Sequence, residues 1–416
     1  MHFGILCPPG TGHLNPMSAL GYELRQRGHR VTLFGLPDVE PYATAANLNF
    51  YPIGIAQYPL GSLKRSQARL GKLDGIPAML YTINLFRQGT EAVLEEIPAA
   101  CKAVDVEALL IDQVLLEGST IAEYLNLPFI TICSALILNP EPSVPPTLLG
   151  WDYDPSWFGQ VRNQIGTNLL KLAGIPVQLI VNQYRDKWSL PPISSKQPLD
   201  IWSNRAIISQ QPPSFEFPRQ ELPDYFHFVG PFVNNTARIE IPFPWDKLNG
   251  KPLIYASLGT IQNKILRVFI DIAYACLGLD VQLVISLGGA SEPLELGYVP
   301  GSPIVVKAAP QLKLLQHASL CITHAGMNTT LESLSNGVPM VAIPITNDQP
   351  AVATRIAYTK TGEVVGLNNC TVDNLKNAIA KVLFEPEYRQ NALKLKAEIE
   401  QVGGLRTAAD IIEANI

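Results

Sequence analysis

The chain has 416 residues, of which 47% are hydrophobic and 16% are charged, and its net charge is −5. This length exceeds what one hydrophobic core holds and predicts two or three domains. The composition excludes a disordered chain, and because no run of Lys or Arg stands out, nucleic acid is not an expected partner.

The cysteines and the N-terminal sequence indicate the compartment. The six cysteines are scattered, without a Cys-x-x-Cys pair or a Cys/His spacing, so they predict neither a metal site nor a disulfide framework. Reduced thiols are typical of cytosolic proteins. We see no signal peptide pattern, and no apolar run reaches the ~20 residues that span a bilayer. We therefore expect a cytoplasmic protein, with a peripheral membrane contact left open.

The first half of the chain alternates short apolar strands with helical stretches. Expected strands cover residues 2–7, 30–35, 49–54, 108–112 and 128–133. Expected helices lie near residues 16–27, 40–47, 77–101 and 118–125. Such alternation predicts a parallel sheet covered by helices on both faces.

The second half repeats this plan after a Pro-rich segment. Expected strands cover residues 252–257, 281–286, 303–306, 319–323 and 338–343. Expected helices lie near residues 264–277, 311–317, 328–336, 349–358 and 372–384.

The two halves predict an α/β fold of two doubly wound, Rossmann-like domains that face each other across a cleft. We expect the N-terminal domain over 1–230, a linker over 231–250 and the C-terminal domain over 251–386. A helical segment over 387–416 is expected to cross back to the N-terminal domain. In such sheets ligands bind beyond the carboxyl ends of the strands, where the strand order reverses. With the common order 3-2-1-4-5, the first and fourth strands of each half meet at that point.

His13 and Asp112 are predicted to form a catalytic pair. His13 lies in a Gly- and Pro-rich loop after the first strand, with Pro16 suited to the first turn of the following helix. Asp112 ends the fourth strand, next to the first in the expected order. Imidazole titrates near neutral pH and can deprotonate a hydroxyl, and a carboxylate can fix its tautomer and stabilise its cationic form.

The Gly-Thr-Gly stretch before His13 also admits a nucleotide-cofactor loop. It is not the GxGxxG pattern of dinucleotide sites, and the expected strand over 30–35 does not end in the acidic residue that would bind a ribose. A dinucleotide-dependent oxidoreductase is therefore disfavoured.

A glycine-containing turn in the second half leads from an expected strand into a helix and is suited to bind an anion. Free backbone N–H groups and the helix dipole both favour negative charge there. His324 comes just before the helix, and Asn328 and Glu332 follow at steps of four on one helical face. Asp348 and Gln349 come after the next apolar strand and can accept hydrogen bonds from sugar hydroxyls.

These motifs match a known signature. The chain resembles the UDP-glycosyltransferases of the GT-B fold (glycosyltransferase family 1), and within them the carotenoid-type branch. The likeness covers nearly the whole chain and rests on several ordered and correctly spaced elements: Gly12-His13, Pro16, Asp112, Ala309-Pro310-Gln311, His324-Ala325-Gly326, Asn328-Thr329, Glu332, Pro339, Pro344 and Asp348-Gln349.

The resemblance implies a role for each matching residue. His13 would be the base and Asp112 its partner. Gln311 and Glu332 would bind the ribose. The diphosphate would be bound by His324, Asn328 and Thr329. The whole implied donor site comprises Ser257, Gly259, Thr260, Ala309, Gln311, His324, Gly326, Asn328, Thr329, Glu332, Asp348 and Gln349.

Two positions depart from the family, and one of them is Met327, where many plant members carry a Trp. The other bears on the donor base. Many members carry a Trp three residues before the Gln, where it stacks on uracil, and here that position is Ala308. The loss of this stacking surface leaves a thymidine nucleotide open as the donor base.

The resemblance implies an inverting transfer of a hexose, with glucose from UDP-glucose as the expected donor. The nucleotide sugar is a co-substrate, no cofactor is expected, and no metal is expected because an Asp-x-Asp metal motif is missing from the C-terminal half. The acceptor pocket is expected in loops near 55–90 and 134–190, which are rich in apolar and aromatic residues. Its candidate residues are Leu136, Leu138, Trp151, Tyr153 and Trp157.

Several alternatives stay open. The apolar residues of these loops suit an extended hydrophobic alcohol, but they equally suit core or interdomain packing. A hydroxylated carotenoid follows only from the branch, and a flavonoid, a polyketide or another lipophilic alcohol is the main alternative. A nucleotide-sugar epimerase of the same fold, or a catalytically inactive lipid- or carotenoid-binding protein, would represent a different class.

Overall fold

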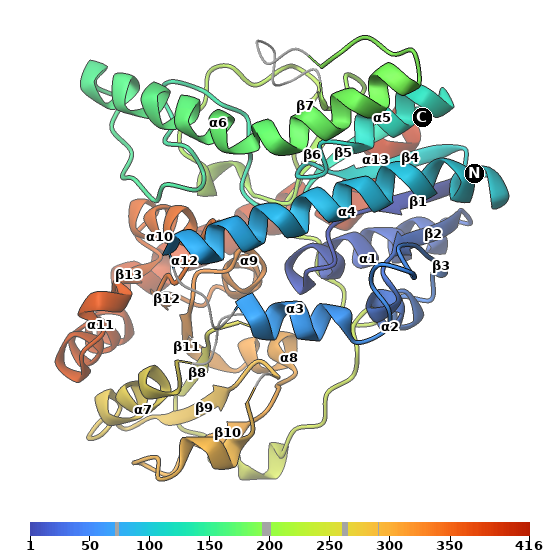
Figure 1. Cartoon of the computed structure of the whole chain (residues 1–416). Helices are drawn as coiled ribbons and strands as arrows, with labels where there is room; N and C mark the ends of the chain where they lie inside the picture. The colour runs from blue at the N-terminus through green and yellow to red at the C-terminus, as the bar shows by residue number, and fades with distance from the viewer. Residues whose placement is uncertain (71–74, 194–200, 260–264, 290) are drawn as a thin grey trace.

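The computed structural model describes residues 1–70, 75–193, 201–259, 265–289 and 291–416. It contains two parallel sheets, one above the other in Figure 1, each covered by helices. The prediction of an α/β fold with two parallel sheets is confirmed.

The N-terminal sheet comprises β1 (His2–Leu6), β2 (Arg30–Gly35), β3 (Asn49–Pro52), β4 (Ala108–Asp112), β5 (Phe129–Cys133), β6 (Ile207–Ser209) and β7 (Phe226–Phe228). Its order is β3-β2-β1-β4-β5-β6-β7, and every neighbouring pair is parallel. The first five strands have the predicted order, which places the ends of β1 and β4 side by side. The strands β6 and β7 were not predicted.

The C-terminal sheet comprises β8 (Leu253–Ser257), β9 (Gln282–Ser286), β10 (Ile304–Val306), β11 (Ala318–Thr323), β12 (Met340–Ala342) and β13 (Gly362–Val364). Its order is β10-β9-β8-β11-β12-β13, again all parallel. The ends of β8 and β11 therefore meet in the same way as those of β1 and β4.

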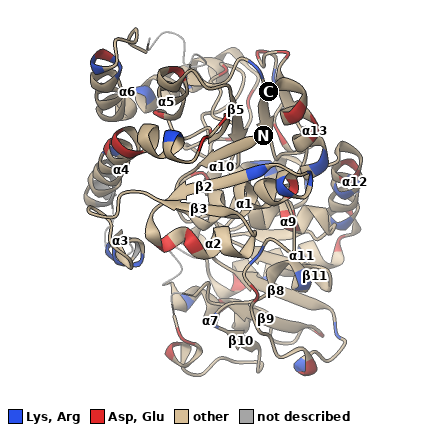
Figure 2. Cartoon of the chain, turned by 90° about the vertical axis from the view of Figure 1, so that its right-hand side faces the viewer, with Lys and Arg blue, Asp and Glu red and all other residues tan. Residues whose placement is uncertain are grey.

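The helices of the first half are α1 (Thr11–Gln26), α2 (Glu40–Ala45), α3 (Ser62–Leu70), α4 (Gly75–Ala103), α5 (Gly118–Leu125) and α6 (Trp157–Lys187). Those of the second half are α7 (Leu266–Ala275), α8 (Gln311–Leu315), α9 (Met327–Ser335), α10 (Gln349–Tyr358), α11 (Val372–Phe384), α12 (Pro386–Val402) and α13 (Leu405–Asn415). In both views α3, α4 and α6 lie on one face of the molecule (Figures 1 and 2). In the described part of the chain, no helix is both long and apolar enough to span a bilayer.

Two local predictions were wrong. The helix α1 begins at Thr11, so His13 lies in its first turn and not in a loop, and Pro16 lies inside the helix. The segment expected as a loop over 134–190 contains the 31-residue helix α6. Its helical period is obscured because Gly159, Gly166 and Pro176 interrupt the pattern and apolar residues occur around much of its circumference.

The chain crosses back to the N-terminal sheet at its end. Gly403 and Gly404 both have positive φ and separate α12 from α13, and the Gly404 N–H donates to the Val229 carbonyl at 2.7 Å. α13 then packs against α1, with Ala408 and Ile412 fully buried in the core of the N-terminal sheet. The last helix therefore ties the C-terminal segment to the N-terminal half.

A buried ion pair joins the two halves. Arg355 of α10 is fully buried and donates from two guanidinium nitrogens to Glu216, which is 1% exposed and follows β6. The Arg355 guanidinium also lies 4.3 Å from the centre of the Phe217 ring. Separating this buried pair would leave an uncompensated charge on each side, so the pair holds the two halves together.

Candidate active site

His13, Asp112 and Ser134 form a hydrogen-bonded cluster at the carboxyl edge of the N-terminal sheet. His13 comes from α1, Asp112 ends β4, and Ser134 follows β5 directly. The His13 Nδ1 atom lies 2.8 Å from Asp112 Oδ2 and 2.8 Å from Ser134 Oγ. Ser134 in turn donates to the same carboxylate oxygen. The structure therefore brings the predicted pair together and adds Ser134, which no spacing in the sequence singled out.

The electrostatics of this cluster suit a base. Burial lowers the pKa of His13, but the charge of Asp112 and its hydrogen bond outweigh burial, with a further contribution from Asp348, and raise it. Asp112 is fully buried, whereas 24% of the His13 side chain is exposed. Because Nδ1 is bound to Asp112, Nε2 is the ring nitrogen left to meet a substrate hydroxyl.

Pro16 helps to join the two halves at this point. In an α-helix the N–H of residue 16 would bond to the carbonyl of residue 12, but proline has no N–H. The Gly12 carbonyl instead accepts a hydrogen bond from Asn328 Nδ2 of α9, at 3.0 Å. On its other side Asn328 Oδ1 accepts from Gln210 Nε2 at 3.1 Å, and Gln210 also donates to the Ser134 carbonyl. The base and the predicted diphosphate site are thus linked by hydrogen bonds between the two halves of the chain.

His324 lies in a tight turn between β11 and α9. A Cβ at Gly259 would lie 2.6 Å from His324 Nε2, and one at Gly326 would also overlap the ring, so both positions need glycine. Ala325 has a φ of 62° and so adopts the left-handed conformation, which is strained for any residue other than glycine. Burial lowers the pKa of His324 to about 4, so the imidazole is neutral.

The Nδ1 atom of His324 is buried and has no hydrogen-bond partner among the described residues. Buried polar atoms of native proteins are nearly always paired, so this atom is suited to a ligand. It lies at the N-terminus of α9, where Gly326 is the N-cap residue without a side-chain cap. The turn can therefore hold an anion.

A buried polar cluster surrounds Glu332, four residues further along α9. Glu332 is 1% exposed and accepts from Gln311 Nε2 at 2.6 Å and from Arg238 Nη2. Gln311 also contacts the Thr329 hydroxyl, at 3.2 Å. Three predicted ribose and phosphate residues are therefore neighbours. Arg238 was missed, because it lies in the Pro-rich linker and belongs to no motif.

The remaining predicted donor residues have varied settings. Ser257 ends β8 and is buried, and Ala309 is buried before α8. Asp348 is the N-cap residue of α10, where burial raises its pKa and the nearby His13 opposes the increase. Gln349 Oε1 accepts from the Ile345 and Thr346 N–H groups at 2.9 and 3.0 Å, so this oxygen already holds the loop. The predicted Thr260 lies outside the described residues.

The five predicted acceptor residues have different surroundings. Leu136 is buried in the core around β8 and α9, and Leu138 packs on a small cluster with Cys133. Tyr153 stacks on Phe217 with the ring centres 5.1 Å apart, in contact with Tyr358 of α10. These three side chains therefore take part in core or interdomain packing, which the sequence left open as an alternative.

The two tryptophans of this set lie at the start of α6. Trp151 packs closely against Gly166, where a Cβ would overlap its ring. The Arg162 guanidinium lies 5.1 Å from the centre of the Trp151 ring. Trp157, the first residue of α6, is 68% exposed.

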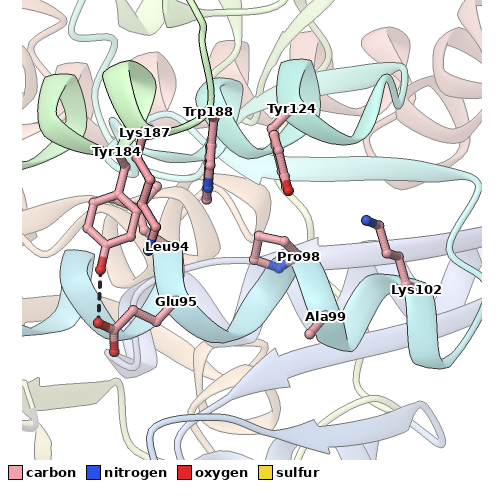
Figure 3. A pocket seen from close by; sticks show the side chains of 9 residues that line it. All are labelled: Leu94, Glu95, Pro98, Ala99, Lys102, Tyr124, Tyr184, Lys187 and Trp188. Atoms are coloured by element: carbon pink, nitrogen blue, oxygen red, sulfur yellow. Dashed lines mark hydrogen bonds between the residues drawn. The ribbon is translucent and has the colours of Figure 1, made fainter.

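A hollow of about 480 Å³ lies between α4, α5 and the end of α6 (Figure 3). Its lining includes Tyr184, which donates to Glu95 at 2.9 Å, and Trp188, which stacks on Tyr124. None of its lining residues belongs to the predicted donor or acceptor sets.

Across the ranges that the structure describes, no three His, Cys, Asp or Glu side chains are grouped so that they could hold a metal ion.

Comparison with known proteins identifies the family. The chain is 32% identical to a zeaxanthin glucosyltransferase of Pantoea ananas, over 99% of this chain and 95% of that protein. It is 31% identical to a zeaxanthin glucosyltransferase of Pseudescherichia vulneris, over 100% and 98%. Residues 200–400 match the family described as UDP-glucoronosyl and UDP-glucosyl transferase.

Solved structures agree on the fold. The glycotransferase of kitacinnamycin superposes with a TM-score of 0.77 at 24% identity, covering 100% of this chain and 98% of that one. The calicheamicin glycosyltransferase CalG4 superposes with a TM-score of 0.76 at 20% identity, covering 100% and 97%. The two sheets, their strand order and these relatives show that the chain belongs to the UDP-glycosyltransferase family, glycosyltransferase family 1, with the GT-B fold.

Proposed function

We propose that this glycosyltransferase moves glucose from UDP-glucose to a hydroxyl of a lipophilic acceptor, such as a hydroxylated carotenoid, with inversion at the anomeric carbon. The observation that carries the proposal is the contact between the base cluster and the donor half. Asn328 bonds to the residue before His13, and Asp348 is close enough to raise the pKa of His13. An acceptor hydroxyl at His13 would therefore lie beside a sugar held at α10.

The chemistry follows from these positions. His13 Nε2 takes the proton of the acceptor hydroxyl while that oxygen forms a bond to the anomeric carbon. The bond from that carbon to the diphosphate breaks, and the diphosphate leaves with the electron pair. Attack opposite the leaving group inverts the centre. Asp112 stabilises the imidazolium that forms, as in other base–carboxylate pairs.

The departing diphosphate is assigned to the N-terminus of α9. The backbone N–H groups there and the Asn328 and Thr329 side chains would stabilise its charge, together with His324 in the neutral tautomer that carries its proton on Nδ1. No metal and no cofactor takes part in the proposed step. Gln311 and Glu332 would bind the ribose hydroxyls, with Arg238 fixing the carboxylate of Glu332.

The choice of acceptor rests on the relatives named as zeaxanthin glucosyltransferases. Glucose is the donor sugar because both names specify a glucosyltransferase. We place the reaction in the cytoplasm, with a peripheral membrane contact that would give access to a membrane-borne alcohol.

The test is product analysis. The purified protein is incubated with UDP-glucose and a dihydroxycarotenoid, and in parallel with a flavonol and a phenolic polyketide. We expect mono- and diglucosides of the carotenoid, with β-configured sugars by NMR. An α-linked product contradicts the inverting step. Glucosides of the flavonol or polyketide alone contradict the carotenoid assignment, and epimerised UDP-sugar without any acceptor contradicts transfer.

A further inference from the structure

The helix α6 carries a long exposed apolar stripe. Its members recur at steps of three and four residues and so lie along one side of the helix. From residue 158 to 179 the stripe is about 32 Å long, at about 1.5 Å per residue. It includes Phe158, Val161, Ile165, Leu169, Leu172 and Leu179.

This exposure is unusual for a soluble surface. Leu169 and Leu172 are 60% and 61% exposed, and Phe158 is 76% exposed. Isolated apolar side chains on a surface need no explanation, but a contiguous patch marks an interaction site. The opposite side of α6 is accounted for, because Val181 is buried in a cluster with residues of α4.

The same face of the molecule carries more basic than acidic residues. The helix α3 has three Lys or Arg and no acidic residue, α4 has two basic and three acidic residues, and α6 has four basic residues and one acidic residue, whereas the net charge of the whole chain is −5. One of the four in α6, Arg185, is buried and paired with Glu123. Lys64, Arg65 and Arg69 of α3 are exposed, as are Leu80 and Phe86 of α4. Figures 1 and 2 place α3, α4 and α6 side by side on this face.

We propose that the face formed by α3, α4 and the stripe of α6 docks on the surface of an anionic lipid bilayer. An amphipathic surface with apolar residues beside Lys and Arg is suited to the interface between anionic headgroups and acyl chains. Docking on a bilayer is a property beyond the transfer reaction. Only its use, the delivery of a membrane-borne alcohol to His13, rests on the proposed function.

Other occupants fit this face less well. A second copy of the chain would bring one cationic face against another, which like-charge repulsion opposes. A single acceptor molecule needs a concave site that encloses it, whereas the stripe lies along the outer side of one helix. A bilayer surface can accommodate a long, convex apolar stripe, and its anionic headgroups complement the neighbouring Lys and Arg.

The test is flotation with vesicles of phosphatidylcholine, with and without phosphatidylglycerol. The wild-type protein is expected to float with the anionic vesicles and much less with the neutral ones, and high salt should release it. Ile165→Ser/Leu169→Ser/Leu172→Ser should lower the bound fraction by at least about tenfold. Lys64→Glu/Arg65→Glu should lower the affinity by roughly tenfold.

Matched controls come from the C-terminal half. Leu294 and Phe384 are 94% and 66% exposed, so Leu294→Ser/Phe384→Ser removes apolar groups that are more exposed than the three replaced in the stripe and should leave flotation unchanged. Lys376→Glu/Lys394→Glu is the control for charge. Circular dichroism and transfer to a water-soluble acceptor confirm that each variant is folded.

Three results would overturn the proposal. They are a wild-type protein that stays with the buffer, a triple serine variant that floats like the wild type, and a wild-type dimer in sedimentation that this variant converts to monomers. Because flotation needs no sugar transfer, its failure leaves the proposed reaction standing, and loss of transfer in solution leaves the docking result standing.

Discussion

At the scale of single residues, the site depends on how Asp112 sets the protonation of His13. Burial alone would keep the imidazole neutral and weakly basic. The buried Asp112 carboxylate instead raises the pKa of His13. Ser134 contacts both side chains and so helps to hold them in place. A base of this kind works when neutral, so transfer should fall as the pH drops below the raised pKa of His13.

Asp112→Asn tests this balance. The amide cannot stabilise an imidazolium, so burial is opposed only by the more modest effect of Asp348 and the pKa of His13 falls. The acidic limb of the kcat/KM profile should therefore move to lower pH, while kcat at its plateau drops about 10²–10⁴-fold. The measurement is a pH series with saturating UDP-glucose. An acidic limb that stays in place would show that His13 is not the titrating group.

At the scale of elements, the turns at the ends of β8 and β11 enclose the His324 ring between two glycines. Gly259→Ala adds a Cβ that overlaps this ring and strains a residue with φ 83°. UDP affinity should fall at least about tenfold, because the imidazole and the α9 N-terminus both shift. Calorimetric titration with UDP measures this loss.

Gly278→Ala is the matched control. Gly278 has nearly the same φ, 81°, but no atom lies within 4 Å of its added Cβ. The substitution should lower stability by about 1–2 kcal/mol through strain alone and leave UDP affinity unchanged. Equal loss of UDP binding in both variants would mean that strain, and not the position of His324, controls the site.

Much of this element plan could be predicted from the sequence. Buried parallel strands such as β4 and β8 are short apolar runs between turn residues, and the signature residues lie at their ends. The start of α1 could not be predicted, because Pro16 resembles a first-turn residue and only the contact between Gly12 and Asn328 explains its place inside the helix. The helix α6 was missed because Gly159, Gly166 and Pro176 interrupt its pattern.

At the scale of the whole molecule, a buried charge pair joins the halves. Arg355→Met leaves Glu216 buried without its main partner, which should lower the free energy of unfolding by about 3–5 kcal/mol. Arg355→Met/Glu216→Gln should recover much of this loss, because no uncompensated charge remains. Urea unfolding measures both. A single variant as stable as the wild type would show that Glu216 finds another partner.

The long-range contacts of the site had no signal in the sequence. Arg238 reaches Glu332 from 94 positions away, and Gln210 reaches Asn328 from 118. Each is an ordinary polar residue in its local sequence, and only the folded arrangement of the two halves gives it a role. The interdomain packing of two predicted acceptor residues had no signal either, since Leu136 and Tyr153 contact side chains of the opposite half.

The most direct test of the central claim is to measure His13→Ala for sugar transfer and for UDP binding in the same preparation. If His13 is the base facing a sugar held by the other half, kcat should fall at least about 10²-fold while the dissociation constant of UDP stays unchanged. A folded variant that retains transfer, or one that loses UDP binding along with it, would contradict the account.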